Sequence, residues 1–262
     1  DMNLQLIATD IDDTLLASGW VMPPQNIEAL QTAHASGIRI VLATIRKRDS
    51  TEMVGNLLNL PYAMICQGGA TIYDYDGSCL HEAVIELELA RTIASFADAH
   101  GIAMITTIAE HNSFVGNAEK VLAVAHAGQR VSCNMAALYA PPTRMLIPGT
   151  QAAQLLIDSF SELPLRFSRH YHNNILQDVV ITAQSASKQH ALTMLCERWN
   201  ITLNNVLALG DSEADIGMLQ IAGVGVAMGN ARPELCAIAD WIAPSCAEGG
   251  VAAAVFRIMN AE

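Results

Sequence analysis

Short apolar runs and helix-spaced apolar residues alternate along the first 66 residues of the chain. Runs of this length predict buried strands, here over residues 4–8, 38–43 and 63–66. Pro23-Pro24 predicts the start of a helix after the first run and Gly37 its end, and Asp49 with Glu52 predicts a capping box on the next helix. Alternating strands and helices are typical of a parallel sheet with right-handed crossovers, so we expect an α/β unit here.

The middle of the chain has a different pattern. A hairpin is predicted over residues 71–82, with its turn at Asp76-Gly77, and beyond Glu86 the expected strands outnumber the expected helices. These strands fall at residues 102–107, 113–115, 144–147, 165–171 and 176–182, with helices near residues 89–101 and 151–160. Such a mixture favours a separate α+β unit with an antiparallel sheet.

The strand–helix rhythm resumes at Lys188, which opens a helix. A buried strand over residues 206–209 ends in Gly210-Asp211, and a helix (216–222), a strand (224–228) and two late helices follow. A unit inserted into another is connected to it twice, as the polar segments 81–86 and 183–187 allow. We therefore predict a core domain of residues 1–82 and 185–262 and an inserted domain of residues 83–184.

Composition narrows the classes of partner. The 262 residues are 52% hydrophobic and 15% charged, which favours a large buried core over disorder. A net charge of −12 argues against nucleic acid or an anionic membrane surface as partner. Six scattered cysteines without a CxxC pair favour reduced thiols, and we find neither a signal peptide nor a membrane-spanning run, so we expect a cytoplasmic protein.

Three carboxylates, Asp10, Asp12 and Asp13, directly follow the first expected strand. Like charges this close repel one another, and a divalent cation would remove that repulsion. In parallel sheets, ligands bind at the carboxyl ends of the strands, where Asp10, Asp12 and Thr44 all fall. Topology alone therefore places a candidate site at these loops.

Together with the later loops, these side chains suit phosphoryl transfer. Asp10 and Asp211 offer the hard oxygen ligands that Mg²⁺ prefers, and Asp12 is placed to act as general acid and base. The Thr44 hydroxyl would hold phosphate oxygens. Lys188 would supply a positive charge to the phosphate and to the Asp10 carboxylate.

The segment Asp10-Ile-Asp12-Asp13-Thr14 resembles the DxDxT signature of the haloacid dehalogenase (HAD) superfamily. Thr44, Lys188 and the loop from Gly210-Asp211 to Asp215 fall where its other three motifs are expected. The insertion, the Ala227-Met-Gly-Asn230-Ala stretch and the late Glu248-Gly-Gly-Val stretch are similar to the Cof-like, C2-capped (type IIB) sugar-phosphate phosphatases.

This resemblance implies a Rossmann-like three-layer parallel core with an inserted α+β cap, and a Mg²⁺-dependent phosphatase working through an aspartyl-phosphate. It implies Asp10 as nucleophile and Asp12 as acid and base. It implies a metal held by Asp10, the backbone carbonyl of Asp12 and Asp211, with Asp215 beside them. Asn230 would help to shape the phosphate pocket.

Three positions depart from the family pattern. Ile45 stands where the family has Gly in Thr-Gly-Arg, and its N–H remains a donor to substrate phosphate. Ala214 replaces an Asn of the fourth motif, and Gln67-Gly68-Gly69-Ala70 replaces Asn-Gly-Ala. Arg46 is either a group that reaches substrate when the cap closes or a surface cation.

The leading hypothesis is a phosphatase that acts on a small phosphorylated metabolite, such as a sugar phosphate. A phosphomutase, which returns the phosphoryl group to a second hydroxyl, is the alternative enzyme. Ile45 and Ala214 motivate a third hypothesis, a non-catalytic phosphometabolite-binding protein with a weakened site. His170 and His172, in the expected cap, either contact substrate or metal or lie on a solvated strand edge. The sequence carries no signal for an oligomeric state.

Overall fold

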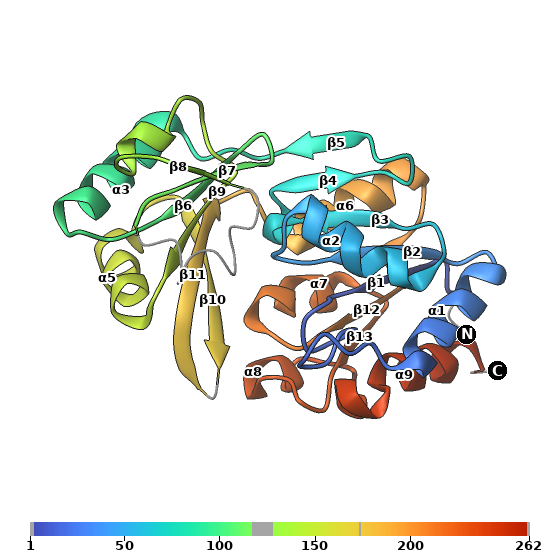
Figure 1. Ribbon diagram of the computed structural model, residues 1–262. Helices are drawn as coiled ribbons and strands as arrows, with labels where there is room; N and C mark the ends of the chain where they lie inside the picture. Colours follow the sequence, from blue (N-terminus) through green and yellow to red (C-terminus); the bar gives the residue numbers. More distant parts are fainter. Residues whose placement is uncertain (1–2, 117–127, 173, 261–262) are drawn as a thin grey trace. The chain divides into compact units, whose positions relative to one another are not determined.

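The structure, a computed structural model, describes residues 3–116, 128–172 and 174–260. The chain forms two compact units (Figure 1). One contains the residues up to His81 and those from Ser187 onward, and the other is Glu82–Ala186. Within the described residues, every helix is too short or too polar to span a bilayer.

The first unit is built on an eight-stranded sheet in the order β14-β13-β12-β1-β2-β3-β4-β5. Its strands are β1 (Leu6–Thr9), β2 (Arg39–Ala43), β3 (Ala63–Cys66), β4 (Thr71–Tyr73), β5 (Cys79–Glu82), β12 (Val206–Gly210), β13 (Val224–Ala227) and β14 (Trp241–Ile242). The strands from β14 to β3 run parallel, and β4 pairs antiparallel with β3. The strand β1 lies between β2 and β12, so three carboxyl ends meet at the middle of the sheet.

Helices cover both faces of this sheet and give it three layers (Figure 1). One face packs on α1 (Pro24–Ala35), α2 (Arg48–Gly55) and α9 (Gly250–Met259), and the other packs on α6 (Lys188–Trp199), α7 (Ile216–Ile221) and α8 (Pro233–Cys236). Strand side chains alternate between the faces, so Ile7 joins one apolar cluster and Ala8 the other. Burial on both faces explains the uninterrupted apolar runs in the sequence.

The second unit has a six-stranded sheet in the order β10-β11-β9-β6-β7-β8. Its elements are α3 (Leu87–Ala99), β6 (Ile105–Ile108), β7 (His111–Phe114), β8 (Gly128–Arg130), β9 (Arg144–Pro148), α5 (Thr150–Phe160), β10 (Leu165–His172) and β11 (Ile175–Ala183). The apolar faces of α3 and α5 pack on one face of this sheet. Pairing is antiparallel except between β7 and β8, so the expected antiparallel sheet is mixed at this edge.

Three local features differ from the sequence prediction. The strand β8 is exposed throughout and β14 has only two residues, so neither carries an apolar pattern long enough to recognise. The predicted capping box of Asp49 and Glu52 is wrong. The helix α2 begins at Arg48, whose Nε donates to the Glu52 carboxylate over 2.7 Å, one turn along the same helix.

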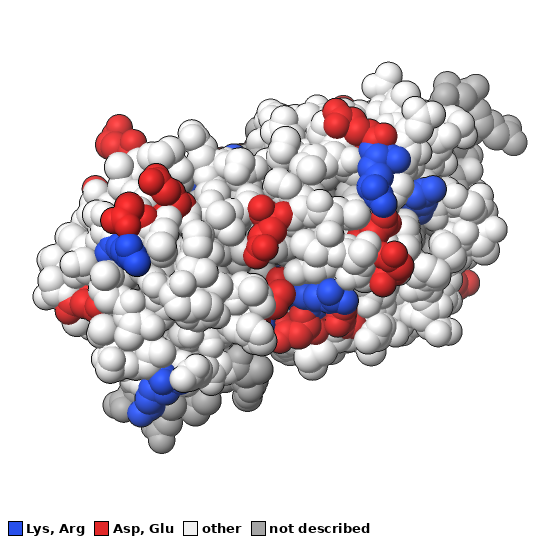
Figure 2. Space-filling model, turned by 90° about the horizontal axis from the view of Figure 1, so that it is seen from above, with Lys and Arg blue, Asp and Glu red and all other residues white. Residues whose placement is uncertain are grey.

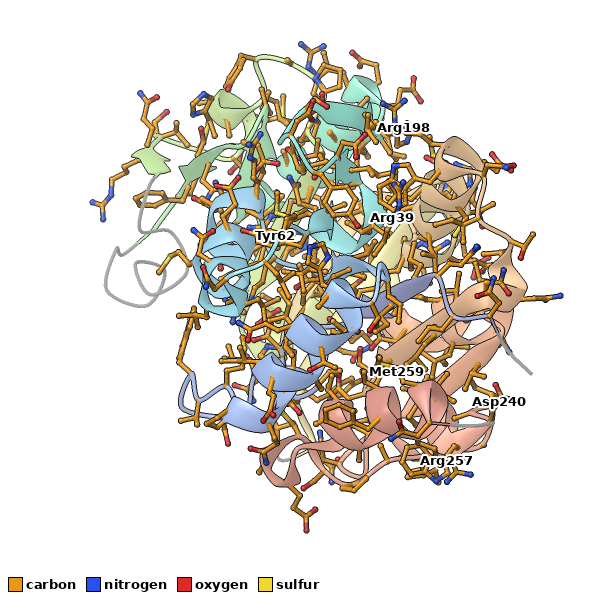
Figure 3. The ribbon with its side chains drawn as sticks, turned by 90° about the vertical axis from the view of Figure 1, so that its right-hand side faces the viewer. Arg39, Tyr62, Arg198, Asp240, Arg257 and Met259 are labelled. Atoms are coloured by element: carbon orange, nitrogen blue, oxygen red, sulfur yellow. The ribbon has the colours of Figure 1, made fainter. Side chains whose placement is uncertain are left out.

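Stacked arginines cover two tryptophans of this unit, Trp199 and Trp241. The Arg39 guanidinium lies 4.7 Å from the ring centroid of Trp199, and that of Arg257 lies 4.5 Å from that of Trp241. Both arginines are labelled in Figure 3. Contacts of this kind contribute about 0.5–1 kcal/mol each at exposed sites. Neither stack involves a residue of the carboxylate loops.

Charged side chains are sparse on the surface. On the face shown in Figure 2, acidic and basic groups form small separate patches within a largely uncharged surface. With a net charge of −12, the protein as a whole does not attract anions. Any anion would therefore have to be attracted locally, by individual cationic groups.

Candidate active site

The candidate site lies where the central parallel strands of the first unit end. Asp10 directly follows β1, Thr44 follows β2 and Asp211 follows β12. Thr9 is in register with Leu42 of β2 and Leu209 of β12, and the Asp10 N–H donates to the Leu209 carbonyl over 3.0 Å. Pairing of the strands therefore brings these loops together.

A buried lysine joins two of the carboxylates. Lys188 Nζ donates to Asp10 Oδ1 over 2.7 Å and to Asp215 Oδ1 over 2.6 Å, and the Lys188 residue is only 2% exposed. Burial alone would lower the pKa of Lys188, but the charges of Asp10 and Asp215 outweigh it and raise that pKa above its usual value. The lysine is therefore a fixed positive charge at the site.

The start of α6 is held in place by close contact with the loop after β3. Ser187 caps the helix, its side chain accepting the His190 N–H over 3.0 Å. Gly69 has a φ of +105°, and a Cβ there would lie 2.3 Å from the backbone carbonyl of Ser187. Only glycine allows this approach, which fixes Lys188 next in sequence. The sequence marked this loop as a departure from the family pattern but did not show its role.

Asp215 organises the loop after β12. Its Oδ2 accepts from the Asp211 N–H, the Ser212 N–H and the Ser212 hydroxyl, each over 3.1 Å. With Oδ1 bonded to Lys188, both oxygens of this fully buried carboxylate are engaged. A Cβ on Gly210 would lie 2.4 Å from Asp215 Cβ, so the strand must end in glycine here. Asp215 therefore both caps this turn and orients Lys188.

The carboxylates carry more negative charge than the lysine neutralises. Burial raises the pKa of Asp10 to about 7, with Asp215 and Asp12 adding to the effect and Lys188 opposing it. Burial, and then the charges of Asp10 and Asp215, raise the pKa of Asp211 well above its usual value. When Asp10, Asp211 and Asp215 are all ionised, their three negative charges and the positive charge of Lys188 sum to −2. Such a site is stabilised by a divalent cation.

The donor set fits a small hard cation. Asp10, Asp211 and Asp215 each offer an oxygen, and the three lie within 4.8 Å of one another. Asp10 has an oxygen beyond the one that contacts Lys188. Within the described part of the chain, the hydrogen bond that Asp211 Oδ1 accepts from Thr14 is long, at 3.4 Å. Carboxylate oxygens at this spacing match the preference of Mg²⁺. The Asp12 carboxylate does not belong to this group of described side chains.

Asp12 points instead to Arg46. Arg46 Nε donates to Asp12 Oδ2 over 2.7 Å and Nη2 donates to Oδ1 over 2.6 Å, a two-pronged contact. The Arg46 N–H also donates to the Thr44 hydroxyl over 3.1 Å. One short loop therefore orients both a candidate phosphate ligand, Thr44, and the candidate acid and base.

The remaining candidate residues lie around this group. Ile45 is half-buried and has no positive φ, so the β-branched residue replaces the family glycine without a left-handed backbone. Asn230 joins two loops: its Nδ2 donates to the Asp13 carbonyl over 2.7 Å, and its Oδ1 accepts the Cys246 N–H over 2.8 Å. Ala214 is half-buried in the loop between Asp211 and Asp215.

The two histidines belong to the second unit. His170 Nδ1 lies 3.0 Å from Asp178 Oδ2, and the pairing of β10 with β11 shifts register directly after His170. The side chain of His172 lies outside the described residues.

A parallel sheet whose neighbouring central strands end in carboxylates linked by a buried lysine is the architecture of a HAD-type hydrolase core. The chain belongs to the haloacid dehalogenase-like hydrolases, whose family model matches residues 7–255. It is therefore an enzyme of the hydrolase class, and the sequence prediction of family and fold is confirmed.

Individual relatives cover nearly the whole chain. Phosphatase YwpJ of Bacillus subtilis is 29% identical over 95% of this chain and 98% of its own length. Pyridoxal phosphate phosphatase YbhA of Escherichia coli is 28% identical over 88% of this chain and 89% of its own. The solved structure of the HAD subclass IIB sugar phosphatase BT4131 superposes with a TM-score of 0.84 at 24% identity, covering 97% of this chain and 99% of that one. This structure shows the shared fold.

Proposed function

We propose that the protein is a Mg²⁺-dependent phosphatase that hydrolyses small phosphomonoesters through an aspartyl-phosphate formed on Asp10. The observation that carries the proposal is the contact between Lys188 and Asp10, with the Asp211 carboxylate beside it. A lysine that binds one oxygen of a buried carboxylate orients the other toward an incoming phosphorus atom. The phosphatase relatives support the reaction class.

Asp10 carries out the first step of the proposed reaction. Its carboxylate oxygen forms a bond to phosphorus as the bond to the leaving oxygen breaks, and Asp12 gives that oxygen a proton. Water then attacks the phosphorus of the aspartyl-phosphate, a proton passes to Asp12 and phosphate leaves. Lys188 keeps its charge through both steps and offsets the charge of the phosphoryl oxygens.

Four backbone or side-chain groups are proposed to hold the phosphate: the Thr44 hydroxyl, the Ile45 N–H, Lys188 and Asn230. The cation would be held by Asp10, the carbonyl of Asp12 and Asp211, with Asp215 keeping the loop and the lysine in place. Bound there, Mg²⁺ supplies positive charge that allows an anionic nucleophile and an anionic substrate to approach. The negative charge of these carboxylates and their hard oxygen atoms support Mg²⁺ as the cation.

The second unit is proposed to be the cap that selects the substrate. It is inserted between the two segments of the first unit, as a C2-type cap would be. The similar solved structure is named a sugar phosphatase. We propose small phosphorylated metabolites, sugar phosphates among them, as substrates in the cytoplasm. Ile45 and Ala214 do not disturb the contacts of Lys188, so the geometry favours catalysis over passive binding.

The test is hydrolysis of 4-nitrophenyl phosphate by the full chain, with and without Mg²⁺. We expect release of inorganic phosphate that requires Mg²⁺ and that Asp10→Asn abolishes. Asp13→Asn is the matched control because Asp13 is an exposed carboxylate on the same loop, and its φ of +57° suits asparagine. Equal rates for the wild type and Asp10→Asn would refute the proposal.

A further inference from the structure

Trp20 occupies a costly backbone position beside the candidate site. It has a φ of +63°, directly after Gly19 at +79°, in a turn closed by pairing of Ala17 with Val21. A bulky residue in the left-handed region costs of order 1–3 kcal/mol, and such residues cluster at functional sites. Its side chain is also 60% exposed, so burial does not repay the cost.

The contact that Trp20 makes is with Arg46. The Arg46 guanidinium lies 4.4 Å from the Trp20 ring centroid, about as close as the stacks of Arg39 and Arg257 on their tryptophans. This stack alone among the three is connected to the carboxylate loops, because Arg46 also binds Asp12.

Arg46 is held on several sides. Its Nε and Nη2 donate to the two oxygens of Asp12, its Nη1 donates to Ser50 Oγ over 3.0 Å, and one face of the guanidinium meets Trp20. Its side chain is only 13% exposed, whereas that of Asp12 is 50% exposed. A half-exposed carboxylate has many rotamers open to it, and this planar fork selects one of them.

The backbone of Arg46 is fixed as well. Its N–H donates to the Thr44 hydroxyl over 3.1 Å, and its carbonyl accepts the Gln67 N–H over 2.8 Å. We propose that Arg46, braced by Trp20, is a positioning residue that sets the orientation of the Asp12 carboxyl group for proton transfer. This inference rests on the proposed function and assigns a role to two residues outside the phosphate and metal contacts.

Asp12 needs this orientation in both halves of the reaction. In the first, the O–P bond from Asp10 forms, the bond from phosphorus to the leaving oxygen breaks, and a proton moves from Asp12 to that oxygen. In the second, the bond from water to phosphorus forms, the bond to Asp10 breaks, and a proton of the water moves to Asp12. A misdirected Asp12 slows these transfers without weakening phosphate binding.

The experiment compares Arg46→Ala and Arg46→Lys with the wild type, using the full chain, Mg²⁺, and 4-nitrophenyl phosphate and phenyl phosphate as substrates. We expect Arg46→Ala to lower kcat about 10- to 100-fold while the inhibition constant of inorganic phosphate changes less than about threefold. The fall in kcat/KM caused by Arg46→Ala should be larger for phenyl phosphate than for 4-nitrophenyl phosphate. Phenolate is the poorer leaving group, so its departure depends more on a proton from Asp12. Added guanidinium ion should restore part of the lost rate.

Matched variants separate positioning from general damage. Arg257→Ala removes an arginine that stacks on Trp241 at a similar ring distance, 4.5 Å. Arg257 is not among the proposed catalytic or binding residues, so this variant should retain wild-type kcat. Trp20→Phe keeps a ring for Arg46 and should stay within about twofold of the wild type, whereas Trp20→Ala should shift kcat in the same direction as Arg46→Ala, by less.

The outcomes are distinguishable. If Arg46→Ala raises the inhibition constant of phosphate but leaves kcat unchanged, Arg46 is a substrate ligand and the inference is overturned. Equal losses for both substrates without rescue by guanidinium would also overturn it, because a merely structural role predicts that result. If the wild type shows no Asp10-dependent turnover, the proposed function itself fails, and the inference with it.

Discussion

Replacing Asp10 by asparagine should stabilise the metal-free protein while removing its proposed nucleophile. The Asp10 side chain is 8% exposed and lies beside two other carboxylates with one lysine among them. Asparagine has nearly the same shape, and its Oδ1 can still accept from Lys188. The change therefore removes one excess negative charge and little else.

The size of the effect follows from the pKa of Asp10, which is about 7 in the folded protein against an ordinary 3.8. The folded chain binds this proton more tightly than the unfolded chain does, so its contribution to stability is complete below pH 3.8. That contribution is lost as the pH rises toward 7, at about 1.4 kcal/mol per pH unit, to a limit of roughly 4 kcal/mol. That pKa already includes the attraction of Lys188 for Asp10, so we expect a net gain of about 2–4 kcal/mol at pH 8.

Thermal unfolding in metal-free buffer measures this gain. For a chain of this size we expect a Tm for Asp10→Asn about 4–16 °C above that of the wild type at pH 8, with the difference vanishing near pH 4. Asp13→Asn should change Tm little at either pH. Mg²⁺ should raise the Tm of the wild type more than that of the variant. A metal-free Asp10→Asn protein that is no more stable than the wild type at pH 8 would refute the excess of buried negative charge.

Three further outcomes follow from the same geometry. Lys188→Met should lower the metal-free free energy of unfolding by about 3–5 kcal/mol, opposite in sign to Asp10→Asn, because it leaves buried carboxylates without their cation; denaturant unfolding measures it. Gly69→Ala should lower both Tm and kcat, because its Cβ must displace Ser187 and with it the start of α6. Removal of divalent metal with a chelator should abolish turnover, and Mg²⁺ should restore it, whereas a chelator-insensitive rate would contradict the metal assignment.

Much of the fold could be predicted because the parallel strands are buried on both faces. The strands β1, β2, β3 and β12 are short apolar runs that end in polar or glycine-containing loops, and the structure places all four within a residue or two of the prediction. Their order along the chain then placed the carboxylates at one edge of the sheet. The strands β8 and β14 were missed because pairing alone defines them, and pairing leaves no hydrophobic pattern in so few residues.

The parts of the site that could not be predicted are contacts between segments far apart in sequence. Nothing local in Gly69 shows that it touches Ser187, and nothing local in Trp20 shows that it stacks on Arg46. A serine before a helix was a readable signal for the cap at Ser187. The partner of Arg46 was not readable, because an arginine after a strand is equally suited to substrate, solvent or a carboxylate.

Trapping of the phosphorylated enzyme tests the central claim most directly. The wild type is mixed with Mg²⁺ and 4-nitrophenyl phosphate, quenched in acid and treated with borohydride, which reduces an acyl phosphate, and the modified residue is located by mass spectrometry. The account predicts reduction at Asp10, dependent on both substrate and Mg²⁺, and absent from Asp10→Asn. Release of phosphate with a modification at another residue, or with none under single-turnover conditions, would contradict it.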